Sequence, residues 1–314
     1  MDDNNKIKIN MLSMADSVDG QGVGSAYLEL MKLLNEDGKN DFEIFLNKGT
    51  KYDVIHAHTV EPRNYLKLKF SKNPTVAYVH FLPDTLDGSI KLPKPIFKIF
   101  KKYVISFYKS SDYLVVVNPI FKKDIAKAGI KEDKITYIPN FVSKEMFYKK
   151  TDKEIKDIRK KLGIKENKFV VLGAGQIQNR KGVIDFVEVA KKLPKIDFIW
   201  AGGFSFGGIT DGHHDLKKIM ENPPKNVRFL GIVPRNEMND LFNASDLLFV
   251  PSYNELFPMT ILEAISTDTP ILLRDLELYE YILFKKNLKG SNNDEFSEII
   301  KLLIKDKNDD QIQV

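Results

Sequence analysis

The segment DLLFVPSYNELFPMTILEA, residues 246–264, has the pattern of a buried strand, a loop and a helix, and it carries two carboxylates eight positions apart. An apolar run of this length is typical of a strand in a parallel sheet, and Pro258 suits the first turn of a helix. Glu255 therefore belongs to the loop and Glu263 to the helix. Both are expected at the carboxyl end of the strand, where parallel sheets bind ligands. The alternative, two surface glutamates, stays open from these residues alone.

Strand-like and helix-like patterns alternate along the rest of the chain. Strand patterns occupy residues 6–12, 42–47, 52–58, 74–81, 112–118, 168–175, 196–203, 226–233, 246–252 and 269–275. Helical periodicity appears between many of them, for example over residues 24–36 and 182–193. Such alternation predicts β-α-β units and an α/β fold with doubly wound parallel sheets. We expect two Rossmann-like domains, residues 1–150 and 151–314, which face each other across a cleft.

Composition narrows the class of protein. The chain has 314 residues, enough for two domains of ordinary size, and 43% hydrophobic with 29% charged residues is normal for a globular protein. No apolar run approaches the roughly 20 residues that span a bilayer, and the N-terminus lacks a secretory signal. The absence of cysteine excludes disulfides and thiolate metal sites. The lack of a secretory signal and of cysteine favours a cytoplasmic protein. The net charge is +5, but no nucleic-acid-binding motif is present, so we expect no nucleic-acid partner.

A glycine-rich turn begins the second half. In GAGQIQNRKG, residues 173–182, Gly173 and Gly175 let the backbone turn tightly and approach a ligand closely. Arg180 and Lys181 place two cations beside the next helix, whose first N–H groups favour an anion. The alternative is an ordinary strand-to-helix turn with a solvated basic pair.

Together, GAGQIQNRKG, WAGG (200–203) and the segment 227–264 resemble the C-terminal domain of family 4 retaining glycosyltransferases, which have the GT-B fold. Glu255 and Glu263 match the Glu-x7-Glu motif of that family. The resemblance implies that Glu255 binds hydroxyls of a donor sugar, that Glu263 binds the ribose of its nucleotide, and that Lys181 binds the diphosphate.

Three positions depart from the family pattern. Gln176 stands where the family usually has an arginine, and we expect Arg180 to supply that charge. Gly175 and Gln176 are also expected to bind the donor. Leu256 and Pro258 replace the two glycines of the usual Glu-Gly-Phe-Gly sequence. Because proline has no N–H, contacts to the donor sugar there are expected to differ.

The first half contains a second glycine-rich stretch, DSVDGQGVGSAY, residues 16–27. Its glycine spacing does not fit the dinucleotide-binding pattern of dehydrogenases. By resemblance it matches the donor loop of the glycosyltransferases, in which Gly20, Gly22 and Gly24 let backbone amides approach the sugar and phosphates. Asp16 and Asp19 have two possible roles, contact with acceptor hydroxyls or capping of a turn.

Three histidines lie at the ends of two strand patterns. His80 stands where the family has its active-site histidine, near the donor sugar. His56 and His58 alternate on a strand and therefore face the same side. Metal binding by this pair requires further ligands that the neighbouring sequence does not supply, so a polar strand end is the preferred interpretation.

Residues 91–109, KLPKPIFKIFKKYVISFYK, predict a basic amphipathic helix. One stripe holds the apolar and aromatic side chains of Ile96, Phe100, Tyr103 and Phe107. Another stripe holds lysines, namely Lys94, Lys98, Lys101 or Lys102, and Lys109. Such a helix is a candidate for binding an anionic membrane surface, and packing of its apolar stripe on the first sheet is the alternative.

These observations predict a glycosyltransferase similar to the bacterial synthases that add a second sugar to monoglucosyl-diacylglycerol. The resemblance implies a UDP-glucose or UDP-galactose donor, a glycolipid acceptor at the inner face of the cell membrane, retention of configuration, and no metal or other cofactor. His80, Arg180, Lys181 and Glu255 are the expected catalytic residues. Two alternatives share the same donor motifs: an enzyme with a soluble sugar or protein acceptor, and a non-catalytic carbohydrate-binding protein.

Overall fold

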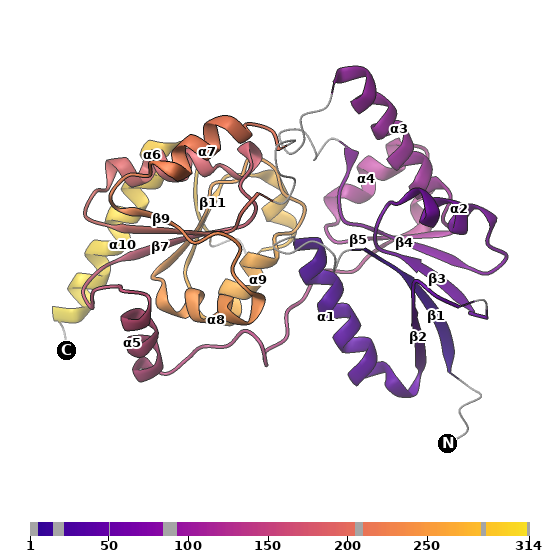
Figure 1. Cartoon of the computed structure of the whole chain (residues 1–314), viewed down its shortest axis with the longest axis horizontal. Coiled ribbons are helices and arrows are strands. Elements are labelled where there is room, and N and C mark those ends of the chain that lie inside the picture. Colours follow the sequence, from indigo (N-terminus) through magenta and orange to yellow (C-terminus); the bar gives the residue numbers. More distant parts are fainter. Residues whose placement is uncertain are drawn as a thin grey trace. The chain divides into compact units, whose positions relative to one another are not determined.

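The computed structural model describes residues 6–14, 22–49, 51–83, 93–204, 210–283 and 287–312, with side chains described up to residue 306. The chain divides into two compact units, one made of residues 1–87 and 92–141 and the other of residues 88–91 and 142–314. Residues 142–150 thus group with the second unit. Each unit is built around its own parallel sheet (Figure 1).

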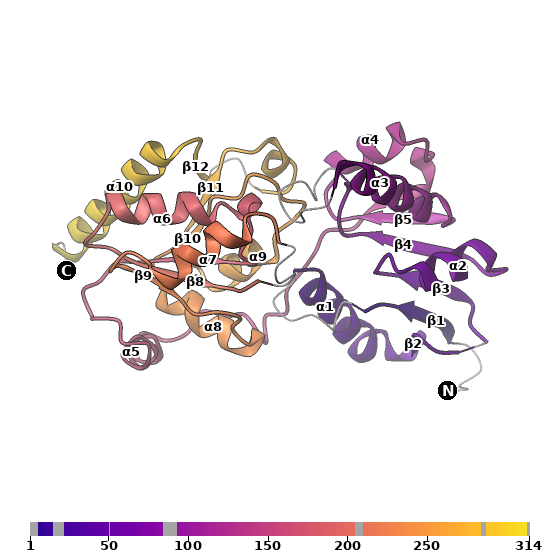
Figure 2. The ribbon, with the colours of Figure 1, turned by 45° about the horizontal axis from the view of Figure 1, so that its top comes forward.

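The first unit contains a six-stranded parallel sheet with the order β2-β1-β3-β4-β5-β6. Its strands are β1 (Ile7–Leu12), β2 (Phe42–Leu46), β3 (Val54–Ala57), β4 (Thr75–Val79), β5 (Tyr113–Val116) and β6 (Ile135–Tyr137). Its α-helices are α1 (Gly22–Glu36), α2 (Pro62–Phe70), α3 (Lys94–Lys109) and α4 (Ile120–Lys127). Figure 2 shows α1 on one face of this sheet and α3 and α4 on the other. The strand order reverses at β1, which creates a switch point between β1 and β3.

The second unit repeats this plan with the order β12-β11-β10-β7-β8-β9. Its strands are β7 (Val170–Ala174), β8 (Asp197–Ala201), β9 (Val227–Phe229), β10 (Leu247–Val250), β11 (Ile271–Arg274) and β12 (Leu288–Gly290). Its helices are α5 (Asp152–Lys161), α6 (Val183–Lys192), α7 (His213–Glu221), α8 (Arg235–Ala244), α9 (Met259–Ser266) and α10 (Asn293–Ile312), with 3-10 turns η6 (Asn179–Lys181) and η8 (Glu277–Tyr281). Here the switch point lies between β7 and β10.

The α/β fold and the strands predicted from the apolar runs are confirmed, and the strand ends differ from the predicted ones by at most four residues. The prediction missed β6 and β12, which have three residues each; β9 is as short but was found because it lies in the longer apolar run 226–233.

Close packing fixes the glycine-rich turn after β7. A Cβ atom on Gly173 would lie 2.4 Å from the ring of Trp200, and one on Gly202 would lie 1.8 Å from the carbonyl oxygen of Gly175. The indole N–H of Trp200 donates to that same carbonyl at 3.0 Å. Side chains at these two glycines would push the turn away from the core, so their absence determines where the turn lies.

Candidate functional site

Both glutamates of the 246–264 segment are buried. Glu255 lies in the loop after β10 with 5% of its surface exposed, and Glu263 lies in the second turn of α9 with 4% exposed. The alternative that they are surface glutamates is therefore wrong. A buried carboxylate requires a partner of opposite charge or strong hydrogen bonds, and each of the two has a different cation beside it.

Lys181 is the partner of Glu255. Its Nζ lies 2.5 Å from Oε1 of Glu255, and Nη1 of Arg180 lies 3.9 Å from Oε2. The turn η6, which carries both cations, is held to the loop after β10: Arg180 donates to the carbonyl of Asn254 at 3.1 Å, and the N–H of Tyr253 donates to the carbonyl of Arg180 at 2.7 Å. The alternative of a solvated basic pair is wrong for these cations, which are largely buried.

The electrostatics of this cluster favour an ion pair. Burial acts to raise the pKa of Glu255, but the charges of Lys181 and Arg180 outweigh it and the pKa is lowered. Burial lowers the pKa of Lys181, against the attraction of Glu255. The cluster is therefore a buried carboxylate with two cations, an excess of positive charge where an anion can bind.

The expected donor-binding residues of the turn after β7 lie next to this cluster. Gly175 has a φ of +136°, which glycine adopts without strain. Gln176 is buried, and its side-chain oxygen accepts a hydrogen bond from Gln178 at 2.6 Å. A Cβ atom on Gly182 would lie 2.3 Å from the carbonyl oxygen of Pro251, so this glycine lets α6 begin against the loop after β10.

Glu263 is held by an arginine that the sequence analysis did not single out. Nη1 of Arg235, the first residue of α8, donates to Oε1 of Glu263 at 2.9 Å. The guanidinium carbon lies 5.1 Å from the centre of the Phe147 ring. Arg235 and Glu263 are 28 residues apart, and no motif indicates their contact.

Arg274 is a second residue that the sequence analysis missed. It ends β11, and its Nε donates to the carbonyl of Pro251 at 2.8 Å while its guanidinium carbon lies 3.9 Å from the centre of the Tyr253 ring. It also forms an ion pair with Asp185 of α6. Arg274 thus supports the loop that carries Glu255. The signal in the sequence was a charged residue directly after the apolar run ILL.

In the first unit, the glycines predicted to form a loop begin a helix instead. Gly22 and Gly24 are the first and third residues of α1, and Gly24 is buried. A helix start still presents N–H groups without partners in the helix, as a donor loop would. Asp16, Asp19 and Gly20 lie outside the described residues.

His80 belongs to a cluster of aromatic rings at the carboxyl ends of β3 and β4. Nε2 of His80 lies 3.1 Å from Nδ1 of His58, and the Tyr78 ring stacks on His80 with 4.8 Å between ring centres. His56 and His58 face the same side, as predicted, with 4.5 Å between ring centres.

Burial keeps these histidines neutral. It lowers the pKa of His56 to about 4, and burial, with the repulsion that a protonated His56 adds, lowers the pKa of His80 to about 3. Burial and the two other histidines lower the pKa of His58. Within the described ranges, no group of three or more His, Asp or Glu side chains has an arrangement that would hold a metal ion.

The predicted amphipathic helix is α3, and its stripe divides into two parts. Phe107 is buried, and Tyr103 donates to the carbonyl of Val60, so this part packs on the unit as the alternative proposed. Ile96, in contrast, is 52% exposed, and its neighbour Ile99, which was not assigned to the stripe, is 68% exposed beside the exposed Lys98. Within the described residues, neither α3 nor any other helix has the length and apolar character to cross a membrane.

Comparisons with known proteins bear on both units. Residues 154–313 match the model of the glycosyl transferases group 1, and residues 39–145 match that of glycosyltransferase family 4. The chain is 50% identical over 297 residues to the alpha-galactosylglucosyldiacylglycerol synthase of Streptococcus pneumoniae, covering 94% of this chain and 79% of that protein. It is 28% identical to the processive diacylglycerol alpha-glucosyltransferase of Acholeplasma laidlawii, covering 93% and 86%.

Solved structures share the fold. The Anabaena protein HepE in complex with UDP-glucose has a TM-score of 0.74 at 18% identity, covering 96% of this chain and 91% of its own. The sucrose-phosphate synthase of Thermosynechococcus elongatus has a TM-score of 0.76 at 13% identity, covering 96% and 90%.

Proposed function

The chain belongs to the family 4 glycosyltransferases with the GT-B fold, and we propose that it transfers a hexose from a UDP-sugar to monoglucosyl-diacylglycerol in a membrane. The resemblance seen in the sequence is thereby confirmed at the level of the family and the fold. The observation that carries the proposal is the buried cluster of Arg180, Lys181 and Glu255 in a chain half identical to a diglycosyl-lipid synthase. The name of that relative favours UDP-galactose over UDP-glucose as the donor.

In the proposed reaction, Arg180 and Lys181 stabilise the UDP leaving group. Negative charge grows on the diphosphate as its bond to the sugar breaks, and two fixed cations beside the start of α6 favour that charge over the ground state. These cations replace a divalent metal ion, so the proposed reaction is independent of metal.

Glu255 and Glu263 orient the donor. Glu255, fixed by Lys181 at 2.5 Å, accepts hydrogen bonds from hydroxyls of the hexose, and Glu263 accepts them from the ribose. Gly175 and Gln176 line the nucleotide from the turn after β7. In the first unit, His80 and the start of α1 at Gly22 and Gly24 are the proposed contributions to sugar binding.

Transfer retains the configuration of the sugar in this proposal. The acceptor hydroxyl oxygen bonds to the anomeric carbon on the face that the diphosphate leaves. The electron pair of the broken bond goes to UDP, and the proton of the acceptor goes to the departing phosphate oxygen. No enzyme carboxylate forms a covalent intermediate, and the cations and Glu255 hold the reactants in place.

The test is transfer of radiolabelled sugar from UDP-galactose and UDP-glucose to monoglucosyl-diacylglycerol in anionic micelles that contain EDTA. We expect a diglycosyl lipid with galactose as the preferred sugar, and an α-linkage by NMR. Transfer to a soluble sugar or protein but not to the lipid would favour the first alternative. UDP-sugar binding without transfer to any acceptor would favour a carbohydrate-binding protein.

We further propose that α3 binds the cytoplasmic surface of an anionic membrane through the exposed side chains in residues 93–109. Exposed Ile96 and Ile99 supply apolar area, and lysines such as Lys98 are each worth about 1 kcal/mol near an anionic surface. The double variant Ile96→Glu/Ile99→Glu is expected to bind phosphatidylglycerol vesicles at least tenfold more weakly in co-sedimentation.

Leu302→Glu, at an exposed leucine of α10, is the matched control and should bind these vesicles like the wild type. Neutral phosphatidylcholine vesicles should bind all three proteins weakly. Equal binding of the double variant and the wild type to anionic vesicles would contradict the role of α3.

A further inference from the structure

The contact between Arg235 and Glu263 carries an inference that rests on the proposed function and deepens it. Glu263 is buried, and its Oε1 accepts a hydrogen bond of 2.9 Å from Nη1 of Arg235. The two residues come from different helices, α8 and α9. The α9 backbone alone allows the Glu263 side chain several rotamers. The hydrogen bond from Arg235 therefore fixes the direction of its carboxylate.

Arg235 is itself held by an aromatic ring. Its guanidinium lies over Phe147, which is fully buried and packs edge-on against Phe242 with 6.1 Å between ring centres. A planar guanidinium stacks on a ring and donates along its edge at the same time, which a lysine ammonium does not do. The ring and the carboxylate together define one position for Arg235.

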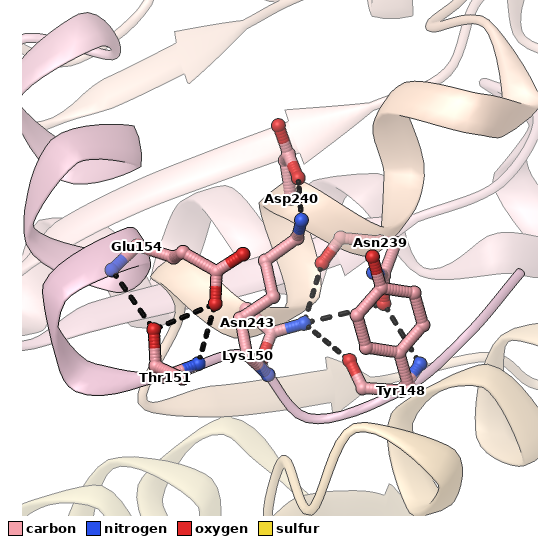
Figure 3. Close-up of polar contacts among 7 residues, drawn as sticks. All are labelled: Tyr148, Lys150, Thr151, Glu154, Asn239, Asp240 and Asn243. Atoms are coloured by element: carbon pink, nitrogen blue, oxygen red, sulfur yellow. Dashed lines mark hydrogen bonds and ion pairs between the residues drawn. The ribbon is translucent and has the colours of Figure 1, made fainter.

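Tyr148 and Lys150, which follow Phe147 directly in the chain, are bonded to residues of α8, as Figure 3 shows. The N–H of Tyr148 donates to Asn239 at 3.1 Å, the N–H of Lys150 donates to Asn243 at 2.7 Å, and Asn243 donates back to the carbonyl of Tyr148 at 2.9 Å. Lys150 also pairs with Asp240 at 3.2 Å. Because both asparagines are buried, these bonds are shielded from water and keep Phe147 against α8.

We propose that Arg235 is a positioning residue for the nucleotide: it holds the Glu263 carboxylate in the orientation that accepts the ribose hydroxyls of the UDP-hexose. A carboxylate has about four acceptor positions, so Glu263 can accept from Arg235 and from ribose hydroxyls together. The site should therefore prefer UDP to 2′-deoxy-UDP. A carboxylate fixed in position to accept from both ribose hydroxyls loses one hydrogen bond when the 2′-hydroxyl is missing.

The experiment compares UDP with 2′-deoxy-UDP by titration calorimetry on the full chain. We expect the wild type to prefer UDP at least tenfold and Arg235→Met to lower this preference to twofold or less. Glu263→Gln should lower it similarly, and the double variant should lose little more, because both changes remove the same bond. Arg235→Lys is expected to keep only part of the wild-type preference for UDP.

Arg228→Met is the matched control, since Arg228 is a partly buried arginine of the same unit whose Nη1 donates to the carbonyl of Leu162. It should keep the full preference. Thermal unfolding identifies any variant that fails to fold; if Arg235→Met does, Arg235→Lys and Phe147→Leu carry the test through the same affinity ratio.

The ratio of the affinities for UDP and 2′-deoxy-UDP distinguishes the possible outcomes. If Arg235 binds the diphosphate directly, Arg235→Met weakens UDP and 2′-deoxy-UDP equally and the preference stays, which overturns the positioning role. A wild type that binds both nucleotides equally also overturns it. A wild type that binds neither would instead contradict the proposed function.

Discussion

Lys181→Ala is expected to lower the turnover of hexosyl transfer by roughly 100-fold or more, the size of effect seen when one group that stabilises transition-state charge is removed. Nζ of Lys181 lies within 2.5 Å of Glu255, and in the proposed reaction it faces the diphosphate as that group gains charge. The substitution removes a cation whose interaction strengthens toward the transition state, so the maximal rate falls and not only the affinity for the donor.

The same substitution leaves Glu255 with Arg180 at 3.9 Å as its cation. Breaking a buried ion pair costs about 3–5 kcal/mol, so stability has to be measured beside activity. Lys181→Met/Glu255→Gln removes both charges and avoids an uncompensated carboxylate. We expect it to unfold near the wild-type temperature and still show the loss of turnover.

Lys191→Ala provides the control, because Lys191 is an exposed lysine of α6 that pairs with Glu188 one helical turn away. Its turnover should stay within about twofold of the wild type, since exposed pairs contribute little. A folded Lys181→Ala protein with the turnover of the wild type would remove Lys181 from the site.

The sequence predicted the parts of this molecule that depend on local pattern. Apolar runs separated by helical periods indicate parallel strands, and glycines before Lys181 indicate a turn that approaches a ligand. Pro258, taken as a residue of the first helical turn, placed Glu255 in a loop and Glu263 in a helix, and the structure places them so.

Contacts between distant side chains were not predictable in the same way. Arg235 meets Glu263 because α8 and α9 bring them together, and His58 meets His80 because they follow the neighbouring strands β3 and β4. Neither the direction of a side chain nor its burial follows from periodicity alone. The start of α1 at Gly22 was missed for a related reason: glycine favours loops in isolation, and the helix is stabilised by packing of residues further along, such as Tyr27.

The three histidines of the first unit predict a loss of stability in mild acid. Their pKa values are lowered in the folded state, to about 4 for His56 and about 3 for His80, whereas an unfolded histidine titrates near 6.5. Above pH 6.5 both states are neutral and these groups leave stability unchanged. As the pH falls below 6.5, the unfolded state binds protons that the folded state does not, so the free energy of unfolding decreases.

The expected decrease is about 1.4 kcal/mol per pH unit for each histidine that takes up a proton on unfolding. Between pH 6.5 and 5 the sum reaches a few kcal/mol for the cluster, a large part of the stability of an ordinary domain. The buried Glu255 contributes at lower pH, since its lowered pKa lies below the value of 4.5 for a free glutamate. The window from pH 6.5 to 5 therefore isolates the histidines.

Hydrogen exchange at residues 54–58 and 75–80, corrected for the intrinsic dependence on pH, measures this effect on β3 and β4 themselves. His56→Gln should reduce the slope of opening free energy against pH by about one proton, because a glutamine takes up none in either state. Above pH 7, where histidine and glutamine are both neutral, His56→Gln should leave the opening free energy near the wild-type value. A wild-type slope near zero between pH 6.5 and 5 would mean that the histidines are protonated in the folded protein, and the neutral cluster around His80 would then be wrong.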